Sequence, residues 1–546
     1  MFKQFVEIFL LLQLFTGCSF QQSLPTDASY VVGVVEFRPE LLNMDIAGRT
    51  AKHLKKYKKL LRSKDAKLTD IVVFPELTLN TLMDPVPVPD PSDSIIPCVP
   101  NSSELISQLS CLAIDTGKYI VINLSESFEC DSLPVHDPRP CDPSVPHRYN
   151  TNVVFDRNGT VIARYRKTHL FREPGTSVTY QPEVVTFDTD FGVRFGVVTC
   201  FDLLFAEPTL ELVKLGVRDF VFPAMWVSEP PFLTAVQIFE SWAYGNDVNL
   251  IAAGTNYDPS GSTGTGVFNG RNGAVFSFIT GESTRKIFPV RVPKLPSSPS
   301  TPLDNDSETV SGRFEGSSLD QVNMGKDFPE RFTTVLIKPE QALKMFNRTV
   351  CNGDFCCQFH IEFETIYGRF VSHLYRLAAF DGVRTFQGYA DAHVSFCAVI
   401  TCLDESLASC GLPNHNSSGY LKFNRLSISG DFIANGTLAM PNSLDNKFHS
   451  LDAKHYQFYS TVDYPNDRQR AVLTLSRTMA NLQTFGIYAF NHRDFDYFIP
   501  DASPPQEDST TTRPPSEDDD GSATAVKASA WILGLAALGI VRSTIL

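Results

Sequence analysis

The stretch Val193-Arg194-Phe195-Gly196-Val197-Val198-Thr199 is mostly apolar and ends directly at Cys200. A short apolar run of this kind, bounded by turn or polar residues, is typical of a buried β-strand. Similar runs recur before and after it, and stretches with helical spacing of apolar residues lie between several of them. Strands that alternate with helices predict an α/β fold around largely buried sheets. The other strand-like runs are 30–37, 71–74, 119–124, 152–155, 220–223, 249–253 and 274–279, and the helix-like stretches are 45–64, 103–114, 208–215 and 233–246.

The chain has 546 residues, which is too long for one ordinary core. Residues 20–292 carry the alternating pattern, and 293–318 are rich in Pro, Ser, Asp and Gly, as a linker would be. From 319 to 500, short apolar and aromatic runs lie among turn residues and six cysteines. This texture predicts a smaller, β-rich second domain that disulfides staple.

The overall charge excludes one class of partner. The formal net charge is -14, whereas a nucleic-acid-binding surface needs a surplus of Lys and Arg. One basic run, from Arg49 to Lys67, has apolar residues at helical spacing, so we interpret it as an amphipathic helix with a solvated basic face. A polyanion or membrane site on that face is the weaker alternative.

Both ends of the chain have the pattern of targeting signals. Residues 1–19 resemble a secretory signal peptide, and 501–520 form an acidic, Pro- and Thr-rich stalk too polar to order itself. Small residues from Gly521, a brief spacer and an apolar tail within 521–546 match a GPI-anchor signal, with Gly521 as the attachment residue. A single-pass helix is the alternative. We therefore expect an extracellular protein, held by a lipid anchor in the outer leaflet of the plasma membrane.

The cysteine count isolates one residue. Cys18 leaves with the signal peptide, which leaves an odd number in an oxidising compartment. Cys200 stands alone between the groups at either end and is the candidate for a free thiol. The adjacent Cys356-Cys357 suits disulfides better than zinc, and the 11 His are scattered, so we expect no metal site. The cysteines available for pairing are Cys98, Cys111, Cys130, Cys141, Cys351, Cys356, Cys357, Cys397, Cys402 and Cys410.

Sequons for N-glycosylation agree with passage through the secretory pathway. Asn123 lies within an apolar run and is the one we least expect to carry a glycan. The full set is Asn101, Asn123, Asn158, Asn305, Asn347, Asn416 and Asn435.

Three residues with reactive side chains each follow a predicted strand: Glu76 follows 71–74, Lys167 follows a further short run at 161–163, and Cys200 follows 193–199. In open α/β sheets, ligands collect beyond the carboxyl ends of strands, so these residues could converge there. Lys167 would lower the pKa of the Cys200 thiol and hold it as a thiolate, with Glu76 as the proton acceptor. An oxyanion formed by attack on an amide carbonyl would bind Lys167 and the backbone N–H of Phe201. The set predicts hydrolysis of a small-molecule amide. The alternative is that each residue is an ordinary solvated loop residue, since any α/β domain has carboxylates and lysines at its strand ends.

The ordered segments resemble the signature motifs of the nitrilase superfamily, and more narrowly its vanin/biotinidase branch. The resemblance covers residues from about 28 to 285 well and the region from Cys351 to Cys410 more loosely. The segments that carry it are Pro75-Glu76, Arg164-Tyr165-Arg166-Lys167 and Thr199-Cys200-Phe201-Asp202-Leu203-Leu204-Phe205, with support from 149–156, 222–226, Ser110-Cys111-Leu112-Ala113 and the spacing of the first four paired cysteines.

This resemblance implies a four-layer α-β-β-α sandwich followed by a vanin-type base domain, with Glu76 as base, Lys167 as cation, Cys200 as nucleophile and no metal or cofactor. Vanins are similar in being GPI-anchored enzymes that hydrolyse pantetheine to pantothenate and cysteamine. Biotinidase-like cleavage of biotinyl amides is the second expectation. A catalytically silent, glycosylated surface protein for adhesion or display is the third.

The chain departs from the vertebrate pattern after Lys167 and around Trp226. Glu173 is either a second carboxylate of the site or a solvated loop residue. Trp226 either lines a substrate pocket or packs as a core aromatic.

Overall fold

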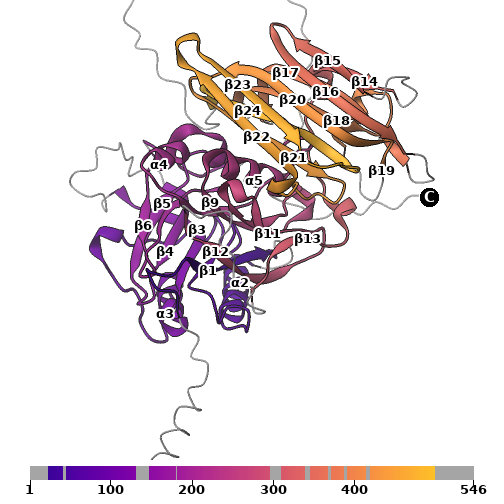
Figure 1. Ribbon diagram of the computed structural model, residues 1–546. Coiled ribbons are helices and arrows are strands. Elements are labelled where there is room, and N and C mark those ends of the chain that lie inside the picture. Colours follow the sequence, from indigo (N-terminus) through magenta and orange to yellow (C-terminus); the bar gives the residue numbers. More distant parts are fainter. Residues whose placement is uncertain are drawn as a thin grey trace, which may run out of the picture. The chain divides into compact units, whose positions relative to one another are not determined.

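The computed structural model of the protein, drawn in Figure 1, describes residues 22–40, 45–130, 147–171, 173–179, 181–295, 309–338, 345–366, 371–386, 390–412 and 418–497. The expected signal peptide 1–19, the stalk 501–520 and the anchor signal 521–546 with Gly521 lie outside these residues. Within the described ranges, no helix combines the length and the apolar content that crossing a membrane requires.

The first part of the chain forms two sheets that share one short junction. The strands are β1 (Ser29–Phe37), β2 (Ile71–Val73), β3 (Tyr119–Phe128), β4 (His147–Phe155), β5 (Val161–Arg166), β6 (Thr186–Asp188), β7 (Arg194–Val197), β8 (Asp219–Ala224), β9 (Asn249–Thr255), β10 (Thr265–Asn269), β11 (Ala274–Ile279), β12 (Arg285–Pro293) and β13 (Gly312–Glu315). One sheet runs β12-β1-β2-β3-β4-β5 and the other β6-β7-β8-β9-β10-β11-β13. They meet where β1 pairs in parallel with β9, at Glu36–Gly254 and Phe37–Thr255.

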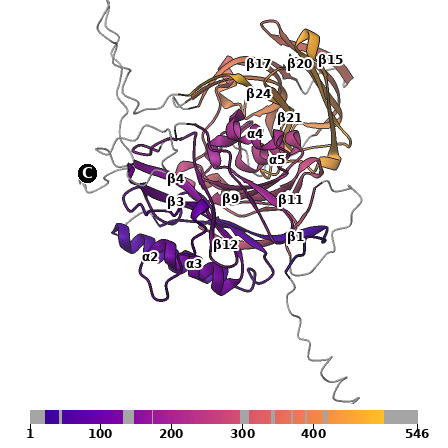
Figure 2. The same ribbon diagram turned by 90° about the vertical axis from the view of Figure 1, so that its left-hand side faces the viewer.

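Helices cover the outer face of each sheet, and Figure 2 shows α2 and α3 on one side of the sheets and α4 and α5 on the other. Their bounds are α2 (Ile46–Leu61), α3 (Leu105–Thr116), α4 (Glu211–Lys214) and α5 (Ala235–Asn246). Three apolar cores separate the layers. One joins the inner faces of the two sheets, one lies under α2 and α3, and one lies under α4 and α5. The expected four-layer α-β-β-α sandwich is thereby confirmed.

Helix α2 confirms the amphipathic helix predicted in the basic run. Its apolar side chains Leu54, Tyr57 and Leu61 are buried, and Tyr57 stacks on Phe74 with ring centroids 3.9 Å apart. The helix begins at Asp45, whose carboxylate accepts a hydrogen bond from the Gly48 backbone, as an N-cap does. The basic face remains outside the core.

Part of the predicted linker 293–318 belongs to the first fold. Strand β13 lies within it and pairs in parallel with β11. Strands β10 and β12 are further elements that the sequence patterns did not indicate. β12 pairs along the whole length of β1, so its place is set by a partner far away in the sequence.

The second part of the chain is a β-sandwich. Its strands are β14 (Thr333–Ile337), β15 (Met345–Asn352), β16 (Phe355–Thr365), β17 (Val371–Phe386), β18 (Ala390–Cys402), β19 (Ser418–Gly419), β20 (Leu421–Ile433), β21 (Thr437–Asp445), β22 (Tyr456–Asp463), β23 (Arg468–Leu475) and β24 (Leu482–Tyr497). One sheet runs β14-β17-β18-β24-β21, with β19 beside β17, and the other runs β15-β16-β20-β23-β22. A core of alternating inward side chains joins them.

Disulfides staple this second sandwich, as the sequence predicted. Cys130 is disulfide-bonded as well, and the free cysteine among the described residues is Cys200. The described pairs are Cys98–Cys111, Cys351–Cys356, Cys357–Cys397 and Cys402–Cys410.

The two parts contact each other through α5 and the loop that precedes it. Gln237 donates to the Asn442 side-chain oxygen at 2.7 Å, and Asn442 donates to the Phe232 carbonyl at 3.0 Å. The Phe232 ring packs against Phe396 and Tyr488 of the second sandwich, at centroid distances of 4.3 and 5.0 Å. Buried amides and aromatic rings therefore tie the sandwich to the first fold.

Candidate active site

Glu76 lies beyond the carboxyl end of β2, where Phe74 and Pro75 lead the chain out of the sheet. Its side chain is only 1% exposed. One carboxylate oxygen accepts from Lys167 at 2.7 Å and from Asn150 at 2.8 Å, and the other accepts from the Met225 backbone N–H at 2.7 Å. The Thr255 hydroxyl donates to the Glu76 backbone carbonyl. These three donors hold both oxygens of the Glu76 carboxylate in place.

Lys167 follows the last residue of β5, and its backbone N–H donates to the Asn150 carbonyl at 2.8 Å. Its ammonium is buried between two carboxylates, 2.7 Å from a Glu76 oxygen and 2.5 Å from a Glu173 oxygen. Asn150 also donates to the second Glu173 oxygen at 2.7 Å. Glu173 is therefore a buried member of this cluster, and the alternative of a solvated loop residue is wrong.

Cys200 opens a short 3-10 turn, Cys200–Leu204, just beyond β7, and is 5% exposed. Its φ of 45° lies in the left-handed region, which residues with a side chain seldom adopt. Asp202 holds the turn, because its carboxylate accepts from the Thr199 backbone at 3.1 Å and from the Tyr165 hydroxyl at 2.7 Å. The Phe201 N–H expected to bind an oxyanion follows Cys200 in this turn.

Burial controls the protonation of the cluster. It raises the pKa of the Cys200 thiol well above its usual value, and the Glu76 charge and hydrogen bond raise it further, whereas Lys167 acts in the opposite direction. Burial would lower the pKa of Lys167, but the charges of Glu173 and Glu76 outweigh it and raise that pKa well above the usual value. The pKa of Glu173 is also raised, by burial first and then by Glu76.

These directions bear on one expectation. Lys167 acts to lower the pKa of Cys200, as the sequence predicted, but burial and Glu76 act more strongly in the opposite direction. The thiolate expected from the sequence stays a prediction. Glu76, which hydrogen-bonds Cys200, is placed to take the thiol proton when attack begins.

Sequence reasoning missed a cluster of three buried asparagines that supports the site. Asn123 donates to the Asn150 side chain at 2.6 Å and to Asn152 at 2.9 Å. Asn152 in turn donates to the Thr199 hydroxyl at 2.8 Å, next to Cys200. The available signal was polar residues spaced by two in otherwise apolar strands, because β3 and β4 pair Asn123 directly with Asn152.

This cluster also corrects one predicted glycosylation site. The Asn123 side chain is fully buried and its amide makes two hydrogen bonds, so the folded protein leaves no space for a glycan there. Asn305 and Asn416 lie outside the described residues. The remaining sequon asparagines are exposed and stay predicted sites: Asn101, Asn158, Asn347 and Asn435.

A narrow, mostly apolar pocket opens beside Cys200, with a free volume of about 30 Å³. Trp226 both lines this pocket and packs in the core, since its indole donates to the Leu233 carbonyl at 2.9 Å and its ring meets Phe239 edge-on. This volume is enough for a water molecule, which needs about 10–15 Å³ by the same measure. The lining residues are Phe171, Cys200, Phe201, Leu204, Met225, Trp226, Val227, Glu229, Leu233 and Phe386.

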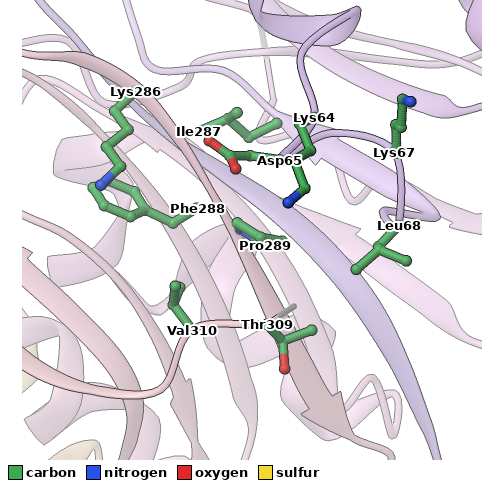
Figure 3. A pocket seen from close by; sticks show the side chains of 10 residues that line it. All are labelled: Lys64, Asp65, Lys67, Leu68, Lys286, Ile287, Phe288, Pro289, Thr309 and Val310. Atoms are coloured by element: carbon green, nitrogen blue, oxygen red, sulfur yellow. The ribbon is translucent and has the colours of Figure 1, made fainter. Parts of the chain in front are cut away.

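A second hollow, of about 400 Å³, lies elsewhere on the first fold. Figure 3 shows Lys64, Lys67 and Lys286 around it, close to the end of α2. None of its lining residues lines the pocket beside Cys200, and its lysines are exposed. Within the described residues, no group of three or more His, Cys, Asp or Glu side chains is arranged to hold a metal ion.

Comparison with known families accounts for most of the chain. Residues 32–253 match the family described as Carbon-nitrogen hydrolase, and residues 322–495 match the Vanin C-terminal domain. These ranges lie inside the predicted domains 20–292 and 319–500.

Curated relatives match along both parts. Vanin-like protein 1 of Drosophila melanogaster is 38% identical over 88% of this chain and 89% of the relative. Biotinidase of Takifugu rubripes is 31% identical over 73% of this chain and 84% of the relative. Pantetheinase of Homo sapiens is 33% identical over 63% of this chain and 65% of the relative.

Proposed function

The chain belongs to the carbon-nitrogen hydrolase family, in the branch that carries a vanin C-terminal domain, and on this premise we propose that it hydrolyses pantetheine to pantothenate and cysteamine. Membership makes it a hydrolase of non-peptide amide bonds. The observation that carries the proposal is the buried group of Glu76, Lys167, Glu173 and Cys200 beside the apolar pocket.

In the proposed reaction, Glu76 accepts the Cys200 proton as the sulfur attacks the amide carbonyl carbon. The carbonyl oxygen becomes an oxyanion, which the Lys167 ammonium and the Phe201 N–H stabilise. The C–N bond then breaks, and Glu76 returns the proton to the departing amine, which leaves as cysteamine. Glu76 next takes a proton from water, whose oxygen attacks the thioester and releases pantothenate and the thiol.

The partners of Lys167 fit this sequence. When Glu76 takes the thiol proton its carboxyl group loses its negative charge, so the Lys167 ammonium can turn its attraction to the negative charge that appears on the substrate oxygen. Interactions that strengthen only in the transition state raise the rate rather than the affinity. Glu173 then acts as a positioning residue that holds Lys167 between Glu76 and the oxyanion.

Hydrolysis of a biotinyl amide is the second candidate. The biotinidase match covers 84% of that relative, whereas the pantetheinase match covers 65%. Both substrates share a linear amide with a bulky acyl group.

The test compares the purified ectodomain, residues 20–500, with Cys200→Ala. We expect the parent to release cysteamine from pantetheine and the variant to lose at least a thousandfold in kcat, because the nucleophile is gone. Thermal unfolding of the variant, matched to the parent, serves as the folding control. Release of the biotinyl product alone would replace pantetheine by the second candidate, and no release from either substrate by folded protein would overturn both.

We further propose that the protein acts outside the cell on a GPI anchor attached at Gly521. The disulfides and the exposed sequons support a secretory route. Cells that express the full chain should present the hydrolase at their surface and lose it on treatment with a phosphatidylinositol-specific phospholipase. Retention after treatment would favour the single-pass helix instead.

A further inference from the structure

Residues of both parts of the chain line the pocket beside Cys200. Phe386, the last residue of β17 in the second sandwich, lines this pocket and is 3% exposed. Its ring lies edge-on to Phe201, the residue after the nucleophile, at a centroid distance of 5.7 Å. One wall of the catalytic pocket therefore belongs to the C-terminal domain.

Arg384, two residues earlier on the same strand, holds this wall in place. Its guanidinium donates to Glu229 at 2.6 Å and to Asp327 at 3.0 Å, and it lies over the Phe386 ring at 4.4 Å from the centroid. The Arg384 side chain is 5% exposed. Glu229 also lines the pocket beside Cys200. One buried cation thus contacts two of the residues that shape the pocket.

The energetics of this group favour a fixed geometry. A buried charge that loses its partner is costly, because neither water nor another charge compensates it. The planar guanidinium can bind two carboxylates and stack on a ring at the same time, which a lysine ammonium cannot do. Since the pocket has so little free volume, a small shift of Phe386 or Glu229 changes which groups fit.

We propose that Phe386 is a specificity-determining residue of the hydrolase and that Arg384 is the positioning residue that fixes it. This inference rests on the proposed amide hydrolysis at Cys200 and extends it, because it assigns substrate selection in part to the C-terminal domain. The group selected is the bulky apolar portion of an acyl or amine moiety that enters beside Phe201.

The experiment uses the whole ectodomain and two substrate series. In one series the amine is cysteamine and the acyl group grows from acetyl through pantothenoyl to biotinyl. In the other the acyl group is pantothenoyl and the amine grows. Phe386→Leu is expected to change the ratio of kcat/KM between the smallest and largest members of one series at least tenfold, in favour of the larger substrate.

Arg384→Met should change the same ratio of kcat/KM, in the same substrate series, by at least fivefold. The change should come mainly from KM, and kcat for the smallest substrate should stay within threefold of the parent value. Arg384→Lys should recover only part of the selectivity, because it keeps the charge without the planar contacts. Arg470→Met is the matched control. It removes an exposed arginine of the same domain that pairs with Asp431, and it should leave both ratios unchanged.

The outcomes separate this inference from the proposed function. Absence of hydrolysis in the parent would count against the proposed function. A parent that cleaves these amides, with both ratios unchanged in folded Phe386→Leu, would overturn the inference alone. If Arg384→Met lowers kcat by the same factor for every substrate, the arginine has only a general structural role, and its assignment as a positioning residue fails.

Discussion

Lys167 shows how neighbouring residues decide what a side chain can do. An ammonium beside a thiol normally favours the thiolate, yet here two carboxylates lie within 2.7 Å of the same nitrogen. The pKa of Cys200 consequently stays well above its usual value. We therefore expect the attacking thiolate to form together with proton transfer to Glu76, and the resting thiol to react slowly with alkylating reagents.

Glu36 is a second buried carboxyl, at the junction of the two sheets. Hydroxyl groups of Thr263 and Thr265 and the Asn256 amide donate to it. Burial nevertheless dominates and raises the pKa of Glu36 to about 7. The folded state therefore binds the Glu36 proton more tightly than the unfolded chain does, so stability falls as pH rises between the ordinary value of 4.5 and about 7.

This sign gives a prediction for Glu36→Gln. The variant should match the parent near pH 4, where both chains carry a neutral group, and should be more stable above pH 8 by up to about 3 kcal/mol. Urea unfolding at several pH values measures the difference. A constant difference between Glu36→Gln and the parent at every pH would contradict the assigned pKa.

For single residues, the sequence indicated which side chains belong to the site, but not how buried they are or what they contact. Glu76, Lys167 and Cys200 were proposed from their place after predicted strands, and they do converge. The burial of Glu173 could not be predicted, since a carboxylate in a loop looks alike in sequence whether it is buried or exposed. For Asn123 the apolar run indicated burial, but only the pairing of β3 with β4 reveals its asparagine partners.

The turn that carries Cys200 is the element on which the proposed chemistry depends. Four donors converge on the Asp202 carboxylate: the Thr199 N–H, the Tyr165 hydroxyl, and the backbone and ring nitrogens of His169. The carboxylate therefore joins the strand before Cys200 to the segment after Lys167. Through it, two of the three catalytic candidates share one support.

Asp202→Asn is expected to loosen this turn. An amide offers one acceptor oxygen where the carboxylate offers two, so at least one donor loses its partner. Because a misplacement of about 1 Å can reduce a rate by roughly a hundredfold, kcat for amide hydrolysis should fall tenfold to a hundredfold while KM changes little. Tyr165→Phe removes one donor only and should cost less. Full activity of Asp202→Asn would show that the turn is held by other contacts.

Element prediction succeeded where periodicity was strong. The run that ends at Cys200 forms β7, and the basic amphipathic stretch forms α2. The sequence did not predict strands β10, β12 and β13, because pairing with neighbouring strands forms them and their own residues show no clear strand pattern. β12 follows β1 across its full length although most of the first fold separates them in sequence.

At the scale of the whole molecule, one buried pair of side-chain amides joins the two parts and allows their energetic coupling to be measured. Gln237 of α5 donates to Asn442 of β21, and each residue also binds a backbone carbonyl of the loop before α5. Single substitutions to Ala should each destabilise the protein by about 1–3 kcal/mol, since buried polar partners are left unpaired.

In a double-mutant cycle, Gln237→Ala and Asn442→Ala should show a coupling of about 0.5–3 kcal/mol in chemical unfolding. Asn424→Ala, which removes an exposed amide that binds Glu364 within the second sandwich, is the control and should have little effect. Strict additivity would mean that this amide pair contributes no coupling between the two parts.

The division into an α/β part and a β-rich, disulfide-bonded part followed from composition and periodicity, and the family resemblance supplied the layer order. What no sequence pattern indicated was that a strand of the second part would line the pocket of the first. That relation depends on the packing of Phe232 against Phe396 and Tyr488, which joins segments too distant for any local signal.

The same packing has a consequence during synthesis. The aromatic face around Phe232 leaves the ribosome early, whereas β24, which carries Tyr488, is about 250 residues behind α5. At ~5–20 residues per second, this interval lasts roughly 10 to 50 s. Throughout it part of the apolar surface of the nascent chain stays uncovered, and until β17 is made the pocket also lacks Phe386. Chaperones therefore meet this surface before its partner strands exist, and we expect a chain that terminates before β17 to be a substrate for quality control rather than a shorter enzyme.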